Sequence, residues 1–218
     1  MLLNSSPKSF GAIKVRLPLV APGQRIGIMG GSFNPPHTGH VRVAETALRR
    51  LGLAQVWWVV TPGNPLKSRG ALKPLATRML ACRQMARPPH MVVTDFEDAL
   101  GTPFTAATLG FLMRRHRAVR FVWVMGADNL ATFHRWQSWR AIAASIPIVV
   151  VDRPGWRLAA LASPAARALA QSRLPETRAL KLANRQAPAW TFLSTRLSDL
   201  SSTVLRNQAQ IRARAEPH

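Results

Sequence analysis

The sequence predicts an α/β fold: a Rossmann-like, doubly wound parallel sheet of five or six strands with helices on both faces. Short apolar runs alternate along the chain with stretches of helical periodicity, the order typical of a parallel sheet with crossover helices. The second of these runs, at 55–62, is continuous in apolar residues, as is common for strands buried on both faces. Clusters of glycine, proline and polar residues follow several of the runs. Because the carboxyl ends of parallel strands meet at one edge of the sheet, we expect a ligand site there.

The strands are predicted from these apolar runs, taken in order. "RIGIMG" (25–30) is a short apolar run that ends in glycine, and "QVWWVVTP" (55–62) is continuously apolar over its central residues 56–60. Runs of the same kind predict further strands at 90–97, 120–126 and 146–154, with a possible sixth at 190–195.

The helices are predicted from apolar residues that recur at helical spacing. "HVRVAETALRRLG" (40–52) has this spacing and stops at a glycine. Further helices are predicted at 75–87, 105–116 and 129–145, the last as one helix or two short ones. Pro164 should break or kink the helical stretch at 157–174. Serine and threonine open a predicted terminal helix at 201–215.

Length and composition favour one globular domain. The chain has 218 residues, of which 47% are hydrophobic. We expect a flexible basic leader over 1–24, with no apolar segment of the kind a secretory signal has, and a single domain over 25–218 that is helical from about 155. No apolar run approaches the ~20 residues of a membrane span, so no membrane partner is expected. A lone cysteine, Cys82, favours a reducing compartment, and we expect a cytoplasmic protein, which could be a homo-oligomer.

The charge is strongly basic, with 30 Lys+Arg against 9 Asp+Glu and a formal net charge of +21. Such a surface attracts phosphorylated ligands and polyanions. A basic nucleic-acid-binding protein is therefore one alternative. The basic residues are dispersed, however, with no zinc-finger spacing or aromatic-rich recognition motif, so no specific nucleic acid is expected.

The stretch "IGIMGGSFNPPHTGH" (26–40) is the most informative in the chain. Its paired glycines let the backbone turn sharply and approach a ligand, and its paired prolines restrict the entry into the helix that follows. His37 and His40 are three apart and share a face once the helix has begun. The amino end of a helix favours phosphate, and imidazole N–H groups can add donors.

Other interpretations of the two histidines are weaker. A metal site would need a third ligand, which the stretch does not offer, so no protein-held metal is predicted. A phosphate-binding P-loop would need Gly-Lys-Ser/Thr after the glycines, and the dinucleotide fingerprint G-x-G-x-x-G is also absent. Taken without their context, two histidines near the start of a helix are more often structural than catalytic.

Six segments, in order along the chain, resemble one enzyme family. "GGSFNPPHTGH" resembles the nucleotidyltransferase signature G-[ST]-F-[DN]-P-x-H-x-G-H. The other five are "TPGNPLK", "TPFTAATL", "MGADNLATFHRW", "DRPG" and "LSSTVLR". Together they are similar to the bacterial nicotinate mononucleotide adenylyltransferases. That resemblance implies transfer of AMP from ATP to nicotinate mononucleotide, giving nicotinate adenine dinucleotide and pyrophosphate in NAD biosynthesis.

The resemblance also implies roles for individual residues. Catalytic roles fall to His37, His40 and Arg206. The ATP-binding residues would be Gly30, Gly31, Ser32, Phe33, Gly126, Asp128, Ser201, Ser202 and Thr203. The residues that bind the pyridine mononucleotide would be Lys67, Phe104, Thr105, Trp136 and Arg153. Mg²⁺ is the expected cofactor, bound mainly through the substrate phosphates.

Within this superfamily, alternatives remain open. A phosphopantetheine adenylyltransferase shares the first motif but lacks the "FHRW" and "RPG" segments, and a nicotinamide mononucleotide adenylyltransferase is a closer rival. The chain departs from the family at two positions: Pro103 stands where serine is usual and Phe104 where tyrosine is usual. Any role of a tyrosine hydroxyl at the pyridine ring is therefore lost.

Overall fold

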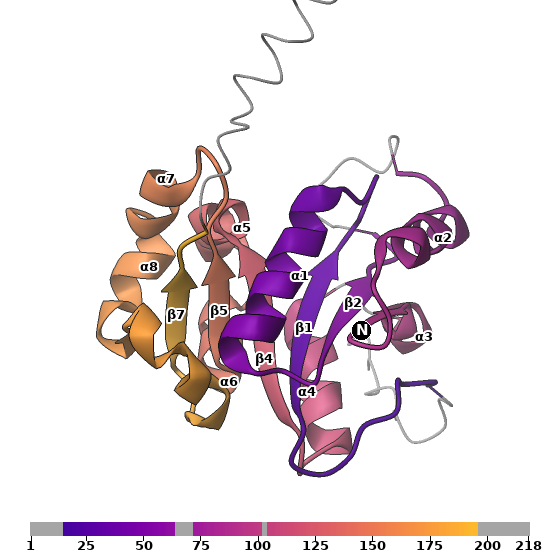
Figure 1. The fold of residues 1–218 in the computed structure, drawn as a ribbon, viewed down its shortest axis with the longest axis horizontal. Coiled ribbons are helices and arrows are strands. Elements are labelled where there is room, and N and C mark those ends of the chain that lie inside the picture. Colours follow the sequence, from indigo (N-terminus) through magenta and orange to yellow (C-terminus); the bar gives the residue numbers. More distant parts are fainter. Residues whose placement is uncertain (1–14, 64–71, 102–103, 196–218) are drawn as a thin grey trace, which may run out of the picture.

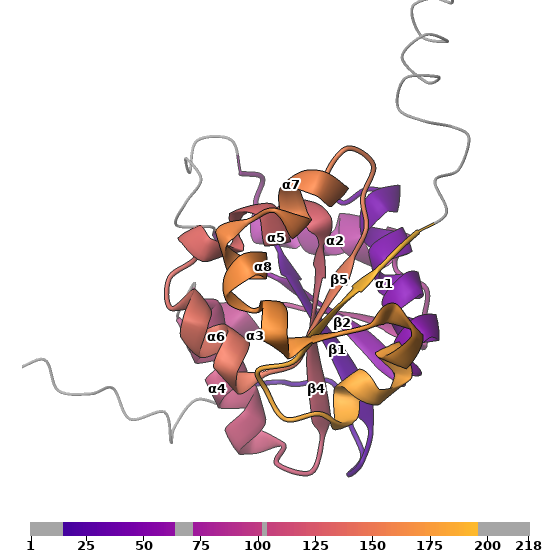
Figure 2. The ribbon, with the colours of Figure 1, turned by 90° about the vertical axis from the view of Figure 1, so that its left-hand side faces the viewer.

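A computed structural model describes residues 15–63, 72–101 and 104–195. These residues form one parallel sheet of seven strands, in the order β3-β2-β1-β4-β5-β7-β6, with helices on both faces (Figures 1 and 2). The strands are β1 (Arg25–Gly31), β2 (Gln55–Val60), β3 (Met91–Thr94), β4 (Arg120–Gly126), β5 (Ile148–Val151), β6 (Arg173–Leu174) and β7 (Trp190–Leu193).

The helices of the described residues alternate with these strands. They are α1 (Thr38–Leu51), α2 (Leu75–Met85), α3 (Phe96–Leu100), α4 (Thr105–Arg115), α5 (Ala127–Thr132), α6 (Trp139–Ser145), α7 (Arg157–Leu161) and α8 (Pro164–Ala168). The 3₁₀ segments are η3 (Phe133–Arg135), η4 (Ala170–Ser172) and η5 (Glu176–Asn184). None of the helices in this part of the chain has the length and apolar character needed to cross a membrane.

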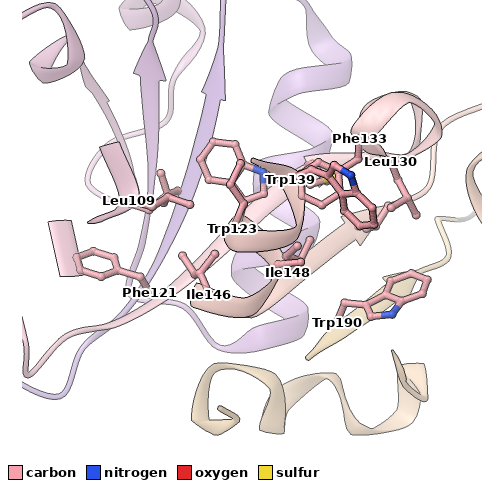
Figure 3. Packing of buried hydrophobic residues seen from close by; sticks show 14 of the residues in the cluster. Leu109, Phe121, Trp123, Leu130, Phe133, Trp139, Ile146, Ile148 and Trp190 are labelled. Atoms are coloured by element: carbon pink, nitrogen blue, oxygen red, sulfur yellow. The ribbon is translucent and has the colours of Figure 1, made fainter. Parts of the chain in front are cut away.

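The sheet separates two hydrophobic cores, because successive strand residues point to opposite faces. Trp57 belongs to the core on one face and Trp58 to the core on the other. Helices α3 to α8 cover the first face, where Trp123, Phe133 and Trp139 pack together (Figure 3). Helices α1 and α2 and segment η5 cover the second. Both faces of the sheet are buried, which explains why the central residues of β1, β2, β4 and β5 are apolar.

The α/β class, the parallel sheet and the helices on both faces are as predicted. The possible sixth strand is β7, the stretch at 129–145 is divided into short helices, and the helix at 157–174 breaks at Pro164. Two elements were not anticipated: the two-residue strand β6, which pairs with β7, and segment η5. The predicted terminal helix at 201–215 lies outside the described residues.

The third predicted strand was too long. It was expected over 90–97, but β3 ends at Thr94 and the chain enters α3 at Phe96. The side chains of Phe96 and Leu100 explain the change, because their four-residue spacing puts both on one face of a helix and into the core.

The described end of the predicted leader packs against the domain. The side chains of Val15, Leu17 and Val20 lie partly buried against the core of the first face, and the Gly23 N–H donates to the Ala118 carbonyl at 2.7 Å. Apolar side chains from this stretch extend the core.

Candidate active site

The strand order reverses between β1 and β4, which are neighbours in the sheet. From β1 the chain runs outward to β2 and β3, and from β4 it runs the other way to β5. Crossovers that leave in opposite directions open a crevice at the carboxyl ends of these two strands. The segments that follow β1, β4 and β5 meet at this edge, and most of the described candidate residues lie in them or at the strand and helix ends beside them.

The loop after β1 is held by an aromatic anchor. Phe33 has a positive φ of 44°, a conformation in which a bulky residue needs support from its surroundings. Its buried ring stacks on Trp58 at 5.2 Å between centroids and lies 4.9 Å from the ring of His40. Packing thus fixes the turn that delivers the two histidines.

The histidines cap the helix that they begin. His37 is the N-cap of α1, and its Nδ1 accepts a hydrogen bond from the Gly39 N–H at 3.1 Å. In return, Nδ1 of His40 accepts one from the His37 N–H, also at 3.1 Å. This is a capping box built from imidazoles in place of the usual hydroxyl and carboxylate. The two ring centroids are 3.9 Å apart, so the predicted shared face is confirmed.

The caps determine which nitrogen of each ring carries the proton. A neutral imidazole has one acceptor and one N–H donor, and here Nδ1 is the acceptor in both rings. Each Nε2 is therefore a donor. Burial lowers the pKa of His40 to about 3, helped by the charges of His37 and Arg153. Burial and the charge of Arg153 also lower the pKa of His37. Both rings are neutral donors near pH 7.

Arg153 brings a cation to the same place. It follows β5, its Nη1 donates to Asp128 Oδ2 at 2.7 Å, and its Nη2 lies 3.5 Å from His37 Nε2. Since both atoms of the second pair carry protons, neither can accept from the other. An anionic oxygen can accept from both. The geometry therefore suits a phosphate beside His37.

Two glycines make room for this cluster. A Cβ on Gly39 would lie 2.8 Å from His37 Cε1 and 2.9 Å from Arg153 Nη2. A Cβ on Gly126 would lie 2.5 Å from Asp128 Oδ1 and 2.8 Å from Arg153 Cδ. Any side chain at these positions would move the arginine or its partners.

Asp128 has one carboxylate oxygen left over. It lies in the first turn of α5, directly after β4, and Oδ2 takes the bond from Arg153. Its Oδ1 is buried and has no hydrogen-bond partner among the described residues. A carboxylate oxygen in this position can accept from a hydroxyl group of a ligand.

Trp136 lies at the end of an aromatic cluster. Its half-buried ring meets Phe133 edge-on at 5.4 Å and Trp123 edge-on at 6.2 Å. The Trp123 ring in turn packs so closely on Gly30 that a Cβ there would lie 2.7 Å away. The cluster links Trp136 to the glycines of β1.

The remaining candidates are spread more widely. Phe104 is the exposed N-cap of α4 and Thr105 is its first residue, at an end where helix amides lack partners within the helix. The structure thus brings together His37, His40, Asp128 and Arg153, and it leaves Phe104 and Thr105 on a separate element. The predicted residues outside the described part of the chain are Lys67, Ser201, Ser202, Thr203 and Arg206.

Comparison with known proteins identifies the family. A family model described as cytidylyltransferase-like matches residues 28–208. A Rhizobium meliloti protein named "Probable nicotinate-nucleotide adenylyltransferase" is 60% identical over 182 residues, which are 84% of this chain and 97% of that protein. A protein of the same name from Cereibacter sphaeroides is 52% identical over 191 residues, 88% of this chain and 99% of that one. This chain belongs to the nicotinate-nucleotide adenylyltransferase family.

Solved structures agree on the fold of this nucleotidyltransferase. The Plasmodium falciparum nicotinic acid mononucleotide adenylyltransferase complexed with NaAD superimposes with a TM-score of 0.59 at 16% identity, covering 84% of this chain and 83% of the other. The complex of the same protein with APC gives a TM-score of 0.58 at 15% identity, with the same coverage.

One residue of the enzyme had no predicted role and lies against the loop of the histidines. Arg78 was assigned only to a helix, yet its side chain is buried and donates to the carbonyl of Ser32. A single arginine in a helical pattern is normally predicted to be solvent-exposed. Only the tertiary structure shows what it contacts.

Proposed function

We propose that this enzyme transfers the adenylyl group of ATP to nicotinate mononucleotide, with release of pyrophosphate. The observation that carries the proposal is the imidazole cap: two Nε2 donors, beside a guanidinium, at the edge where β1 and β4 part. The choice of acceptor follows the names of the relatives at 52% and 60% identity.

The reaction needs positioning and charge stabilisation. An oxygen of the mononucleotide phosphate attacks the α-phosphorus of ATP in line. The new P–O bond forms as the bond from the α-phosphorus to the bridging oxygen breaks, and pyrophosphate leaves with that oxygen. The Nε2 donors of His37 and His40 and the guanidinium of Arg153 stabilise the charge on the phosphoryl oxygens.

Mg²⁺ would enter with the nucleotide. Among the residues that the structure describes, no group of three or more His, Cys, Asp or Glu side chains could hold a metal ion. Mg²⁺ keeps several waters and binds readily through substrate phosphates. It would neutralise the triphosphate there, and chelation by excess EDTA is expected to abolish turnover.

The second substrate would lie toward α4 and Trp136. The half-buried indole of Trp136 offers a face for an electron-poor pyridine ring, and backbone amides near Phe104 and Thr105, where α4 begins, would bind its carboxylate. Lys67 would reach the mononucleotide phosphate, and Asp128 Oδ1 would accept from a ribose hydroxyl. Because backbone N–H donors favour a negative charge, we expect the acid to be preferred over the amide.

A pyrophosphate-release assay with a panel of acceptors tests the proposal. The panel is nicotinate mononucleotide, nicotinamide mononucleotide and phosphopantetheine, each with ATP and Mg²⁺. We expect the highest kcat/KM with nicotinate mononucleotide. Equal or better use of the amide would contradict the acid preference, and no release with any acceptor would contradict the enzyme itself.

The net charge of +21 keeps a nucleic-acid-binding protein as the alternative. Binding through phosphate contacts alone weakens steeply with salt. RNA binding that persists at high salt, in a protein that does not bind ATP, would favour that alternative. We also expect the reaction in the cytoplasm, since the lone thiol of Cys82 fits a reducing compartment.

A further inference from the structure

Arg78 is a buried cation next to the catalytic loop. It lies in the first turn of α2 and is only 2% exposed. Among the described residues its charge is paired with no carboxylate, and burial lowers its pKa. Burying a charge costs free energy unless hydrogen bonds replace its lost hydration. The surroundings of Arg78 must therefore supply those bonds.

Four backbone carbonyls from three chain segments supply them. Nη1 donates to Ser32 O at 2.8 Å and to Thr61 O at 2.7 Å. Nη2 donates to Pro62 O at 3.3 Å, and Nε donates to Lys73 O at 2.8 Å. Four of the five N–H groups of the guanidinium are used. The planar fork of arginine is the only side chain that can make all four bonds at once.

The three segments belong to the two loops that the proposed function assigns to the two substrates. Ser32 is in the loop between β1 and α1 that carries the histidines. Thr61 and Pro62 follow β2 and begin the segment that continues to Lys67. Lys73 lies just before α2. The side chain of Arg78 thus joins the loop after β1, assigned to ATP, to the loop after β2, assigned to the mononucleotide.

Two further hydrogen bonds run between the same segments. The Thr61 N–H donates to Gly31 O at 3.0 Å, and the Lys73 N–H donates to Asn34 Oδ1 at 3.3 Å. The loop of residues 31–34 is therefore tied to both neighbouring segments, with the guanidinium at the centre of the network.

We propose that Arg78 is a positioning residue. It holds the loop between β1 and α1, assigned to ATP, and the loop between β2 and α2, assigned to the mononucleotide, at the relative position that in-line transfer needs. The inference rests on the proposed function, because it needs two substrates held by two loops. In-line attack is sensitive to small displacements, and a misplacement of about 1 Å can lower the rate about 100-fold. Loss of the guanidinium would let the two loops shift relative to each other.

Substitution of Arg78 on the purified full-length enzyme tests the proposal. Arg78→Met keeps much of the side-chain volume and removes all the donors, whereas Arg78→Lys keeps the charge and offers three donors from a single point. Arg83→Met, an exposed arginine on the same helix, is the matched control. We expect kcat/KM to fall about 100-fold for Arg78→Met and less for Arg78→Lys, with a rise in the KM for each substrate. The control should stay within about twofold of the wild type.

The assay is run well below the melting temperature of each variant and normalised to folded protein. If Arg78 only stabilised the fold, Tm would fall while kcat and both KM values of the folded molecules stayed unchanged, and that result would overturn the proposal. If Arg78→Met does not fold, the kcat, KM and Tm values of Arg78→Lys are compared with those of the wild type and Arg83→Met instead. Rescue of Arg78→Ala by free guanidinium ion at low concentration, but not by urea or sodium chloride, would support it further.

Hydrogen exchange separates this proposal from the proposed function. The amides of residues 31–34 and 60–63 are expected to exchange faster in Arg78→Met or Arg78→Lys than in the wild type and the Arg83→Met control. This readout needs no substrate. Unchanged exchange in both segments would refute the positioning role even if the wild type transfers AMP. Faster exchange in a protein that turns over no acceptor would instead count against the proposed function.

Discussion

At the residue scale, each histidine of the candidate site has two roles on two nitrogens. The Nδ1 atoms close the capping box of α1, and the Nε2 atoms are left as neutral donors, that of His37 beside Arg153. The structural and functional interpretations of such histidines are usually treated as alternatives. Here the cap is what orients the donors.

Substitution of His40 by asparagine separates the two roles. An Asn Oδ1 can take the place of Nδ1 and accept from the His37 N–H, but the Asn Nδ2 donor is too short to reach the position of Nε2. We expect turnover to fall by ~10²–10³, the loss typical of one preorganised donor, with Tm close to that of the wild type. His90→Asn, an exposed histidine next to β3, serves as the control. A His40→Asn enzyme with full turnover would show that Nε2 does not touch the reacting phosphates.

The low pKa of His40 makes stability depend on pH. The folded value is about 3, whereas an unfolded histidine titrates near 6.5. Between these values the unfolded chain binds a proton that the folded chain does not, so the free energy of unfolding decreases as the pH falls. Thermal melts between pH 7 and pH 5 should show a smaller loss of Tm for His40→Asn than for the wild type. An equal loss of Tm in the two proteins would mean that the His40 ring binds its proton as readily in the folded chain as in the unfolded chain.

At the element scale, the start of α1 depends on a glycine in its first turn. Replacing a helical glycine by alanine usually stabilises a helix by about 1 kcal/mol. At Gly39 the new Cβ would lie 2.8 Å from His37 Cε1 and 2.9 Å from Arg153 Nη2. The helix gains propensity, but the site loses its arrangement.

We therefore expect Gly39→Ala to lower turnover strongly and to change Tm little. Gly110→Ala in α4 is the matched control, because its Cβ meets only the flexible end of Arg114, at 3.2 Å. Kinetics with both substrates and thermal melts of the two variants provide the comparison. Wild-type kinetics in Gly39→Ala would mean that Arg153 can move away without consequence.

Elements with a long, regular pattern were predictable, and the short ones were not. Helix α1 and strand β2 carry enough periodic or continuous apolar residues to be read locally. Strand β6 has two residues and exists through its pairing with β7. Two residues are too few to form a pattern that predicts a strand. The hydrogen bonds that define β6 come from β7, which is distant in the sequence.

At the scale of the whole molecule, residues 157–193 complete the domain. Segment η5 packs on α1, and the side chain of Leu182 is fully buried in the same core as Val149 and Val151 of β5. The protein should therefore unfold in one cooperative transition, as small single domains usually do.

The Leu182→Ala variant tests whether the protein unfolds in one cooperative transition. Removing the buried side chain is expected to lower the free energy of unfolding by about 2–5 kcal/mol while keeping a single transition. Leu180→Ala on the same segment, where the leucine is 60% exposed, should stay within about 0.5 kcal/mol of the wild type. Denaturant-induced unfolding of both variants, followed by fluorescence and by circular dichroism, measures the free energy of unfolding and the number of transitions. Separate transitions in the Leu182→Ala melts would indicate that the carboxyl-terminal part unfolds independently.

The sequence by itself determined the α/β class, most of the elements and the loop of paired histidines, because these follow from local periodicity and from residues close together in the chain. Tertiary structure alone decided that Arg153 and Asp128 lie beside His37 and that Arg78 joins two loops. Those contacts link residues 17 to 116 positions apart. Local patterns cannot encode them, because they arise only when parallel strands bring their carboxyl ends to one edge.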